Sequence, residues 1–275
     1  MPDPTGWVTL ALAAIVGSTI GGVAGFGTGV IMIPAIAWVV GVKSTVPVLT
    51  VCMLLGNSAR VWFSRDEIEW RVVSAFLLGA VPMTIVGATL YTHIEGRWLS
   101  RMMGAFMILA VPLGRGLAGA GVAVRLRHFP LVGAFFGFLS ALVGSVGPIM
   151  TPFFLSHGLR KGRYLSTDAL CTVGTYITRA IIFRRNELLT GPLITIGLYI
   201  GVVMIGGAWL GRRLVDRMSE RTFPRILEGL LVFFGPPSPP LAERLTRARE
   251  SGRREPPCPS RPASPASSSR SSPPS

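Results

Sequence analysis

Long apolar stretches separated by short polar turns make up most of this chain. Charged residues are nearly absent from residues 6–41, 46–59, 72–92, 102–114, 129–157 and 188–211. A helix rises 1.5 Å per residue, so about 20 apolar residues cross a hydrocarbon core of about 30 Å. Because several stretches reach that length, the pattern predicts an all-α polytopic membrane protein that is embedded in a lipid bilayer.

The apolar stretches form two sets of five predicted membrane segments. The first set covers residues 7–24, 28–41, 46–63, 72–92 and 99–119, and the second covers residues 129–143, 147–157, 167–183, 188–210 and 225–235. All six tryptophans fall near the end of a segment. This placement is typical of the aromatic belt at membrane–water interfaces.

A glycine-to-proline motif occurs once in each set. The first copy, residues 25–34, reads GFGTGVIMIP, and the second, residues 144–152, reads GSVGPIMTP. Because the same order of segments surrounds both copies, we expect two related membrane repeats, residues 1–121 and 122–235. Five segments is an odd number, so the second repeat should be inverted relative to the first. Shared apolar and glycine-rich composition is the alternative source of these identities.

Glycines interrupt the apolar sequence at positions 21, 22, 25, 27 and 29. Each glycine costs about 1 kcal/mol relative to alanine inside a helix, so the cluster predicts a broken or re-entrant segment. Unwound backbone must line a protected cavity, because bare polar groups cannot face lipid. Close helix packing through small residues is the alternative. Paired interruptions in two halves indicate a transporter's binding site, here with Gly25, Gly27, Gly29 and Gly147 as substrate-binding candidates.

The formal net charge of +14 comes mainly from arginines in short turns and in the tail, which does not favour nucleic-acid binding. Five segments per half place Lys43, Arg97, Arg101, Arg184 and Arg185 on the N-terminal side. The other side receives Arg65, Arg71, Arg115, Arg125, Arg127, Arg160, Lys161, Arg163, Arg212, Arg213, Arg217 and Arg221. The positive-inside rule then predicts an N-terminus outside the cell membrane.

The last 40 residues differ in composition from the rest of the chain. Residues 236–275 are rich in Arg, Pro and Ser, a composition that predicts a disordered tail. The apolar stretch before it, residues 226–234, spans only about 14 Å as a helix. We interpret this as a curtailed final helix, with a regulatory tail as the alternative.

The third segment of each half supplies polar candidates for the site. Asn57 and Arg60 lie in the first half, and Thr175 and Arg179 lie in the second. Arginines within membrane segments usually face a cavity or a partner, and a planar guanidinium matches two oxygens of an oxyanion. We therefore expect Arg60 and Arg179 to contact an anion, Arg179 more strongly because it lies deeper. Snorkelling to lipid phosphate is the alternative.

Three further residues of these segments are candidates for secondary roles. Cys52 and Cys171 fall at nearly equivalent positions, where they would make soft contacts with a sulfur-bearing substrate or pack as small buried hydrophobic residues. Asp168 would serve in proton coupling or cap the start of a helix. No metal site, cofactor, catalytic triad or phosphate-binding loop is indicated, so we do not expect an enzyme. A homo-oligomer is left open.

The combined motifs resemble the TauE/SafE family of sulfite exporters and sulfonate-associated permeases. The resemblance rests on Gly21-Gly22-x-x-Gly25-x-Gly27-x-Gly29 with Pro34, Gly147-Pro148-x-x-x-Pro152, Gly87-Ala88-x-Leu90 and Gly207-Ala208-x-Leu210-Gly211, and it covers residues 7–234. It departs where Leu142-Val143 replaces glycine and where the last helix is short. The resemblance implies a secondary transporter of a small anion, such as a sulfur oxyanion or sulfonate, across the inner membrane. An anion channel and a non-transporting assembly protein are the alternatives.

Overall fold

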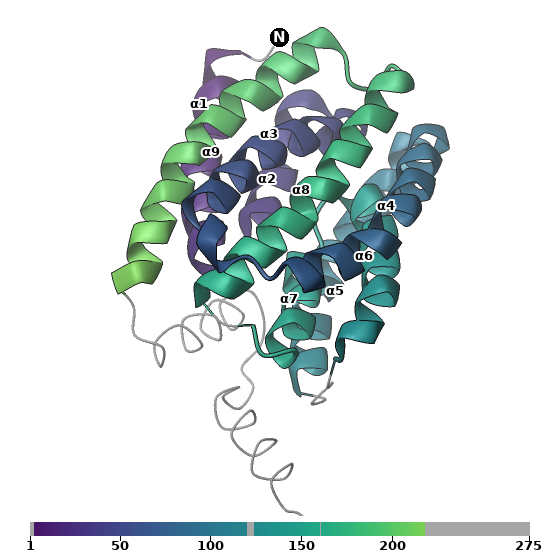
Figure 1. Cartoon of the computed structure of the whole chain (residues 1–275). Helices are drawn as coiled ribbons and strands as arrows, with labels where there is room; N and C mark the ends of the chain where they lie inside the picture. Colours follow the sequence, from purple (N-terminus) through teal and green to yellow (C-terminus); the bar gives the residue numbers. More distant parts are fainter. Residues whose placement is uncertain (1–2, 120–123, 160, 218–275) are drawn as a thin grey trace, which may run out of the picture.

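A computed structural model describes residues 3–119, 124–159 and 161–217 of the chain. These residues form helices α1 (Pro4–Ala24), α2 (Thr28–Val40), α3 (Val42–Phe63), α4 (Trp70–His93), α5 (Gly96–Gly119), α6 (Phe129–Val143), α7 (Gly147–Ser156), α8 (Lys161–Arg185) and α9 (Gly191–Arg217), with short 3₁₀ turns η1 (Arg65–Glu67) and η2 (Leu126–His128) (Figure 1). The predicted last segment, residues 225–235, and the tail, residues 236–275, lie outside the described residues.

Five of these helical stretches are long and apolar enough to cross a membrane. They are α1, α3, α4, residues 126–143 with α6, and α9. The all-α polytopic membrane fold is therefore confirmed within the described part of the chain. Helices α2 and α7 have 13 and 10 residues, about 20 and 15 Å of helix. These lengths are shorter than a hydrocarbon core.

The outer surface of the helices is apolar, as expected where lipid replaces water. Leu78, Ile108 and Leu131 are each about three-quarters exposed. Arg101 lies over the ring of Trp98 and Arg213 over the ring of Trp209. Tryptophans at segment ends beside cationic side chains are the arrangement that a membrane–water interface favours.

Two helix pairs flank the molecule, α1 with α9 on one edge and α4 with α6 on the other (Figure 1). Glycine allows the close approach in both pairs. A Cβ at Gly22 of α1 would lie 3.0 Å from the Cα of Gly211 in α9, and a Cβ at Gly133 of α6 would meet the carbonyl of Phe76 in α4. Small residues are what membrane helices use to pack tightly when no hydrophobic effect drives their association.

Helices α3 and α8 lie side by side between these pairs and run in opposite directions. Arg60, near the end of α3, donates to the carbonyl of Leu165 in the early turns of α8. The backbone N–H of Glu69, which follows η1 and precedes α4, donates to Thr167 of α8. At the other end, the hydroxyl of Tyr91 donates to the carbonyl of Lys43 at the start of α3, and its ring packs against Phe183 near the end of α8. The two third segments are thus antiparallel, with Lys43 and the first turn of α8 at opposite ends of the bundle.

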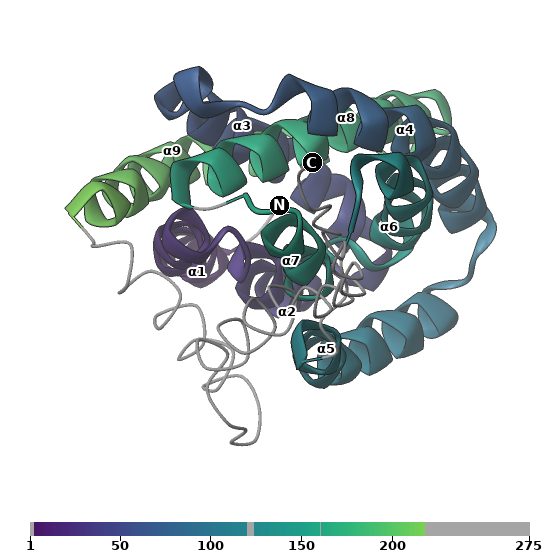
Figure 2. The same ribbon diagram turned by 60° about the horizontal axis from the view of Figure 1, so that its bottom comes forward.

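Helix α5 lies at the edge of the bundle, beside α7 (Figure 2). A Cβ at Gly114 of α5 would meet the carbonyl of Pro148 in α7. This contact places α5 directly behind the second broken segment.

Candidate functional site

The two glycine-containing breaks predicted from the sequence meet in the structure. Between α1 and α2 the chain turns through Gly25 and Gly27, with φ of 83° and 103°, values that glycine adopts without strain. The second break lies between α6 and α7, at residues 144–146. A Cβ at Gly147 would lie 2.6 Å from the Cβ of Phe26, and one at Gly29 would overlap Ser145. Each break therefore packs directly on the other.

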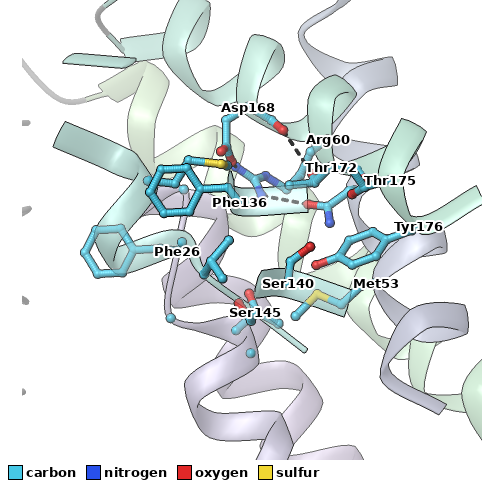
Figure 3. Close-up of a pocket in the computed structure, with 18 of the residues that line it drawn as sticks. Phe26, Met53, Arg60, Phe136, Ser140, Ser145, Asp168, Thr172, Thr175 and Tyr176 are labelled. Atoms are coloured by element: carbon cyan, nitrogen blue, oxygen red, sulfur yellow. Dashed lines mark hydrogen bonds and ion pairs between the residues drawn. The ribbon is translucent and has the colours of Figure 1, made fainter. Parts of the chain in front are cut away.

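A pocket of about 580 Å³, counting its open side, lies where the two breaks meet α3 and α8. Its lining comprises Gly25, Phe26, Gly27, Thr28, Gly29, Met53, Asn57, Arg60, Phe76, Phe136, Gly137, Ser140, Ser145, Val146, Gly147, Met150, Asp168, Thr172, Thr175 and Tyr176. Figure 3 shows hydroxyl, amide and charged groups gathered with aromatic rings around this space. Clefts in which polar groups are placed among apolar and aromatic side chains are typical of small-molecule sites.

The N-termini of α2 and α7 both reach the pocket. Thr28 and Gly147 are the first residues of these helices, and both line the space. The first N–H groups of a helix have no partner within it, and the helix dipole places partial positive charge there. In α7 this leaves the N–H of Gly147, because Pro148 has no N–H and the N–H groups of the next two residues donate to the carbonyl of Val146. Two such ends in one pocket favour an anion.

Arg60 is the cation among the described residues that line the pocket (Figure 3). Its Nη1 donates to Asn57 Oδ1 at 2.8 Å, and its Nη2 lies 3.5 Å from the carbonyl of Leu165 and 3.8 Å from Asp168 Oδ2. Its Nε is buried and has no hydrogen-bond partner among the described residues. Arg60 is therefore held in place from one side and retains a free donor.

Asp168 lies inside α8, two turns after its first residue, Lys161. The alternative that Asp168 caps the start of a helix is therefore wrong. The predicted segment began at residue 167, because the polar residues before it resemble a loop, whereas they form the first turns of α8.

Most of the predicted site residues line the pocket. These are Gly25, Gly27, Gly29, Asn57, Arg60, Gly147, Asp168 and Thr175. Arg179, Cys52 and Cys171 are not in the lining; both cysteines are buried. The structure therefore gives no support to direct substrate contact by these three residues.

Arg179 lies behind the pocket and serves the second break. It is 1% exposed, and its Nη1 donates to the carbonyls of Ser140 and Gly144 at the end of α6. Its guanidinium lies 4.6 Å from the ring centre of Tyr176, which itself lines the pocket. A cation at a helix C-terminus offsets the negative end of the dipole, so Arg179 stabilises the α6 end in the membrane interior.

The glycines at positions 21, 22, 25, 27 and 29 have two different roles, lining of the pocket and close packing of helices. Gly25, Gly27 and Gly29 line the pocket. Gly21 and Gly22 do not, because Gly21 packs on Thr28 and Gly22 on α9. Cavity lining is therefore wrong for Gly21 and Gly22, where helix packing is the observed role.

Several lining residues were not selected from the sequence. Ser140 is a polar residue in the otherwise apolar segment 129–143, and that contrast was a usable signal. Ser145 lies within the second glycine motif, beside the break. Met53, Phe76 and Phe136 carry no such signal, because apolar side chains in membrane segments usually face lipid or the core.

Within residues 3–119, 124–159 and 161–217, no group of three His, Cys, Asp or Glu side chains is arranged to hold a metal ion. The polar groups of the pocket are two helix N-termini, the ion pair of Arg60 with Asp168, the amide of Asn57 and several hydroxyl groups. Four of these hydroxyl groups donate to helix carbonyls, those of Thr28, Ser140, Thr172 and Thr175. The helix N-termini and the guanidinium of Arg60 are the groups that favour an anion.

The fold and the pocket define a polytopic membrane protein with a polar site where the break between α1 and α2 meets the break between α6 and α7. Residues 10–236 match the family model described as "Sulfite exporter TauE/SafE", so the chain belongs to this family. It is also similar to a protein of Cupriavidus necator described as "Probable sulfite/organosulfonate exporter TauE", at 24% identity over 227 residues, 78% of this chain and 86% of the relative. No solved structure matches the chain significantly.

Proposed function

We propose that this protein is a secondary transporter that moves a small sulfur oxyanion or sulfonate across the inner membrane through the pocket. One observation carries the proposal: the N-termini of α2 and α7 and the guanidinium of Arg60 meet around one space. The two helix ends add partial positive charge to a lining in which Arg60 is paired with Asp168 at 3.8 Å, and in a low-dielectric interior this potential favours negative charge.

The remaining lining fits a sulfonate group with a short carbon chain. A guanidinium offers donors in a planar fork that matches two oxygens, and Arg60 retains an unpartnered Nε. Ser145 places a hydroxyl group in the same lining, whereas the hydroxyl groups of Thr172 and Thr175 donate to carbonyls of their own helix. Phe26 and Phe136 add apolar surface for carbon atoms. The family and the name of the C. necator relative support a sulfur-containing anion.

An inverted duplication of the two halves is part of this proposal. If α1 corresponds to α6, α3 to α8 and α4 to α9, the pair α1–α9 corresponds to the pair α6–α4. Both pairs are close-packed, and α3 lies antiparallel to α8. These contacts support alternating access by rocking of one half against the other.

The orientation can be tested by cysteine labelling. We propose that the end with residues 64–69 faces the cytoplasm, because arginines are concentrated there, and that the N-terminus lies outside. Lys43→Cys and Lys161→Cys, each introduced after replacement of the native cysteines, should label from opposite faces of the membrane. Labelling from the same face would refute the inverted arrangement.

Counterflow in reconstituted vesicles tests the proposed function. Vesicles loaded with sulfite, sulfate, taurine or acetate receive trace labelled anion, and we expect saturable exchange for sulfite or taurine. Flux without saturation would indicate a channel instead. A complete absence of flux with all four solutes would favour an assembly protein. Arg65→Ala, which changes a side chain 63% exposed outside the pocket, is the control for loss of positive charge.

A further inference from the structure

The pocket contains one cation and one carboxylate. Among the described residues that line it, only Arg60 and Asp168 carry a charge at neutral pH. Their side chains are 12% and 5% exposed, and Nη2 of Arg60 lies 3.8 Å from Oδ2 of Asp168. Figure 3 shows Asp168 reaching toward Arg60 from the opposite helix. Within this lining, the carboxylate stands where a substrate anion would pair with the arginine.

We propose that Asp168 is an exchangeable counter-ion: it pairs with Arg60 in the empty pocket and takes up one proton when a substrate monoanion binds. The inference rests on the proposed transport of an anion through this pocket. It adds that each binding event is linked to one proton. The proton comes from water, adds to the carboxylate and leaves again when the anion departs, so no oxidant or reductant is needed.

Charge balance in the membrane interior carries this inference. With the ion pair formed, the lining is neutral, and one entering monoanion would leave a net negative charge in a poorly solvated site. Burying an uncompensated charge is strongly unfavourable. Protonation of Asp168 restores neutrality and frees Arg60 for the new anion. No other carboxylate lines the pocket among the described residues.

The geometry allows the exchange without moving Arg60. The separation of 3.8 Å between Arg60 and Asp168 is longer than the 2.7–2.9 Å of a close charge-assisted hydrogen bond. Arg60 is held separately by Asn57 and by the carbonyl of Leu165. Loss of the carboxylate's charge therefore leaves the guanidinium anchored and its unpartnered Nε in place.

Asp168 is the carboxylate that exchanges a proton in this proposal, and the titratable and charged groups that surround it are few. From α3, Arg60 faces it. On its own helix, Tyr164 and Cys171 lie one turn away, and Tyr164 shares a hydrogen bond with Thr151 of α7. The lining residues of α1, α2, α4, α6 and α7 carry no charge.

Two further carboxylates lie close to α8, and both are paired with arginines. Glu67, which lies against Gly162, pairs with Arg212 at 2.7 Å. Glu69, which precedes α4 and contacts α8 through Thr167, pairs with Arg163 at 2.9 Å. Neither carboxylate therefore replaces Asp168 as the proton acceptor in the pocket.

Calorimetry on the full-length wild-type protein counts the protons directly. Methanesulfonate is the probe, because it keeps one negative charge at every pH used. Titrations at one pH in two buffers of different ionisation enthalpy should report uptake of about one proton per anion. Between pH 6 and pH 8.5 the affinity should fall with rising pH, approaching about tenfold per unit above the pKa of Asp168.

Asp168→Asn assigns this linkage to a residue. The amide cannot take up a proton, so the affinity for methanesulfonate should become independent of pH. At pH 8 the dissociation constant of the variant should be lower than that of the wild type by a factor of about ten or more. Asp66→Asn removes a carboxylate that is 94% exposed and should retain the wild-type pH dependence.

The outcomes separate this inference from the proposed function. Wild-type binding without proton uptake, or an unchanged pH slope in Asp168→Asn, would overturn the inference and leave anion transport standing. If neither methanesulfonate nor sulfite binds the wild type at any pH, the proposed function itself fails. Should Asp168→Asn not fold, the proton count on the wild type decides.

Discussion

Two arginines on neighbouring helices, Arg60 of α3 and Arg179 of α8, have different surroundings. Arg60 lines the pocket, and its side chain is 12% exposed. Arg179 is 1% exposed and lies behind the pocket, where its Nη1 meets the carbonyls at the end of α6. Both guanidinium groups keep buried nitrogen atoms without a partner among the described residues, Nε in Arg60 and Nε with Nη2 in Arg179. The comparison teaches that neither burial nor a free donor identifies a substrate contact; the position of the guanidinium relative to the pocket separates the two arginines.

Arg60→Ala should have the largest effect on function. It removes the cation of the pocket and leaves Asp168 unpaired, so anion affinity should fall at least about 30-fold, equivalent to about 2 kcal/mol or more. Binding of methanesulfonate at pH 6, measured by calorimetry, checks this. Arg60→Lys should recover part of the affinity, because it restores charge but not the planar fork.

If the affinity of Arg60→Ala for methanesulfonate stays within about threefold of the wild-type affinity, Arg60 does not contact the anion and its proposed difference from Arg179 fails. The Arg65→Ala variant is the matched control, because Arg65 lies at the exposed end of the same segment and its side chain is 63% exposed.

Arg179→Met should reduce stability more than affinity. The substitution keeps apolar volume but removes this donor from the carbonyls of Ser140 and Gly144. The carbonyl of Ser140 still accepts from the N–H of Gly144, so the carbonyl of Gly144 is the group that loses its donor, and an unsatisfied buried group costs about 1–3 kcal/mol. We expect a lower thermal midpoint in detergent, with affinity per folded molecule reduced less than about tenfold.

A loss of affinity without a loss of stability in Arg179→Met would support the expectation from the sequence that Arg179 contacts the anion. If affinity falls as far as in Arg60→Ala while the thermal midpoint stays unchanged, Arg179 contacts the anion directly.

Gly25→Ala and Gly41→Ala compare a lining glycine with one away from the pocket. Both have positive φ, 83° and 84°. With ψ of −19°, Gly25 lies in the left-handed region, where alanine costs about 1–2 kcal/mol, whereas with ψ of 159° Gly41 lies in a region that only glycine adopts readily. Only at Gly25 would the new Cβ meet another residue, the ring of Tyr164, whereas nothing lies within 4 Å at Gly41. Tyr164 is fixed by its hydrogen bond to Thr151.

We therefore expect both variants to lose thermal stability through backbone strain, and only Gly25→Ala to lose anion affinity. Thermal melts and binding titrations on both variants measure this. Unchanged affinity in Gly25→Ala would show that the break beside Tyr164 tolerates a side chain.

The smallest effect is expected for the ion pair of Glu69 with Arg163, at the polar end of the bundle. The side chain of Arg163 is 63% exposed, and exposed pairs contribute about 0–1 kcal/mol. A double-mutant cycle with Glu69→Gln and Arg163→Gln, read as thermal stability, should give a coupling in this range. A coupling of several kcal/mol would mean that this pair, unlike a surface pair, holds the two helices together.

The sequence predicted the helices well, because their lengths and apolar content are dictated by the membrane. The segment at residues 129–143 coincides with α6, and the breaks at residues 25–27 and 144–146 follow from glycine. The start of α8 was missed by six residues, because buried contacts with α3 and η1 stabilise turns whose polar composition resembles a loop.

The site was predicted less completely than the fold. Gly25 and Arg60 were selected correctly as residues of the pocket lining, because glycine breaks and membrane-embedded arginines are unusual in themselves. The order between the arginines was reversed: depth in the segment favoured Arg179, whereas the structure places that side chain on the end of α6.

By itself, the sequence determined that the chain is a helical membrane protein with two interrupted segments, since local composition and the thickness of a bilayer fix those features. Only the tertiary structure decided that both breaks face one pocket, that Arg60 rather than Arg179 opens into it, and that Asp168 stands opposite. All three features depend on distances between helices that are far apart in the sequence. They depend on close packing at residues such as Gly22 and Gly133, which no local pattern specifies.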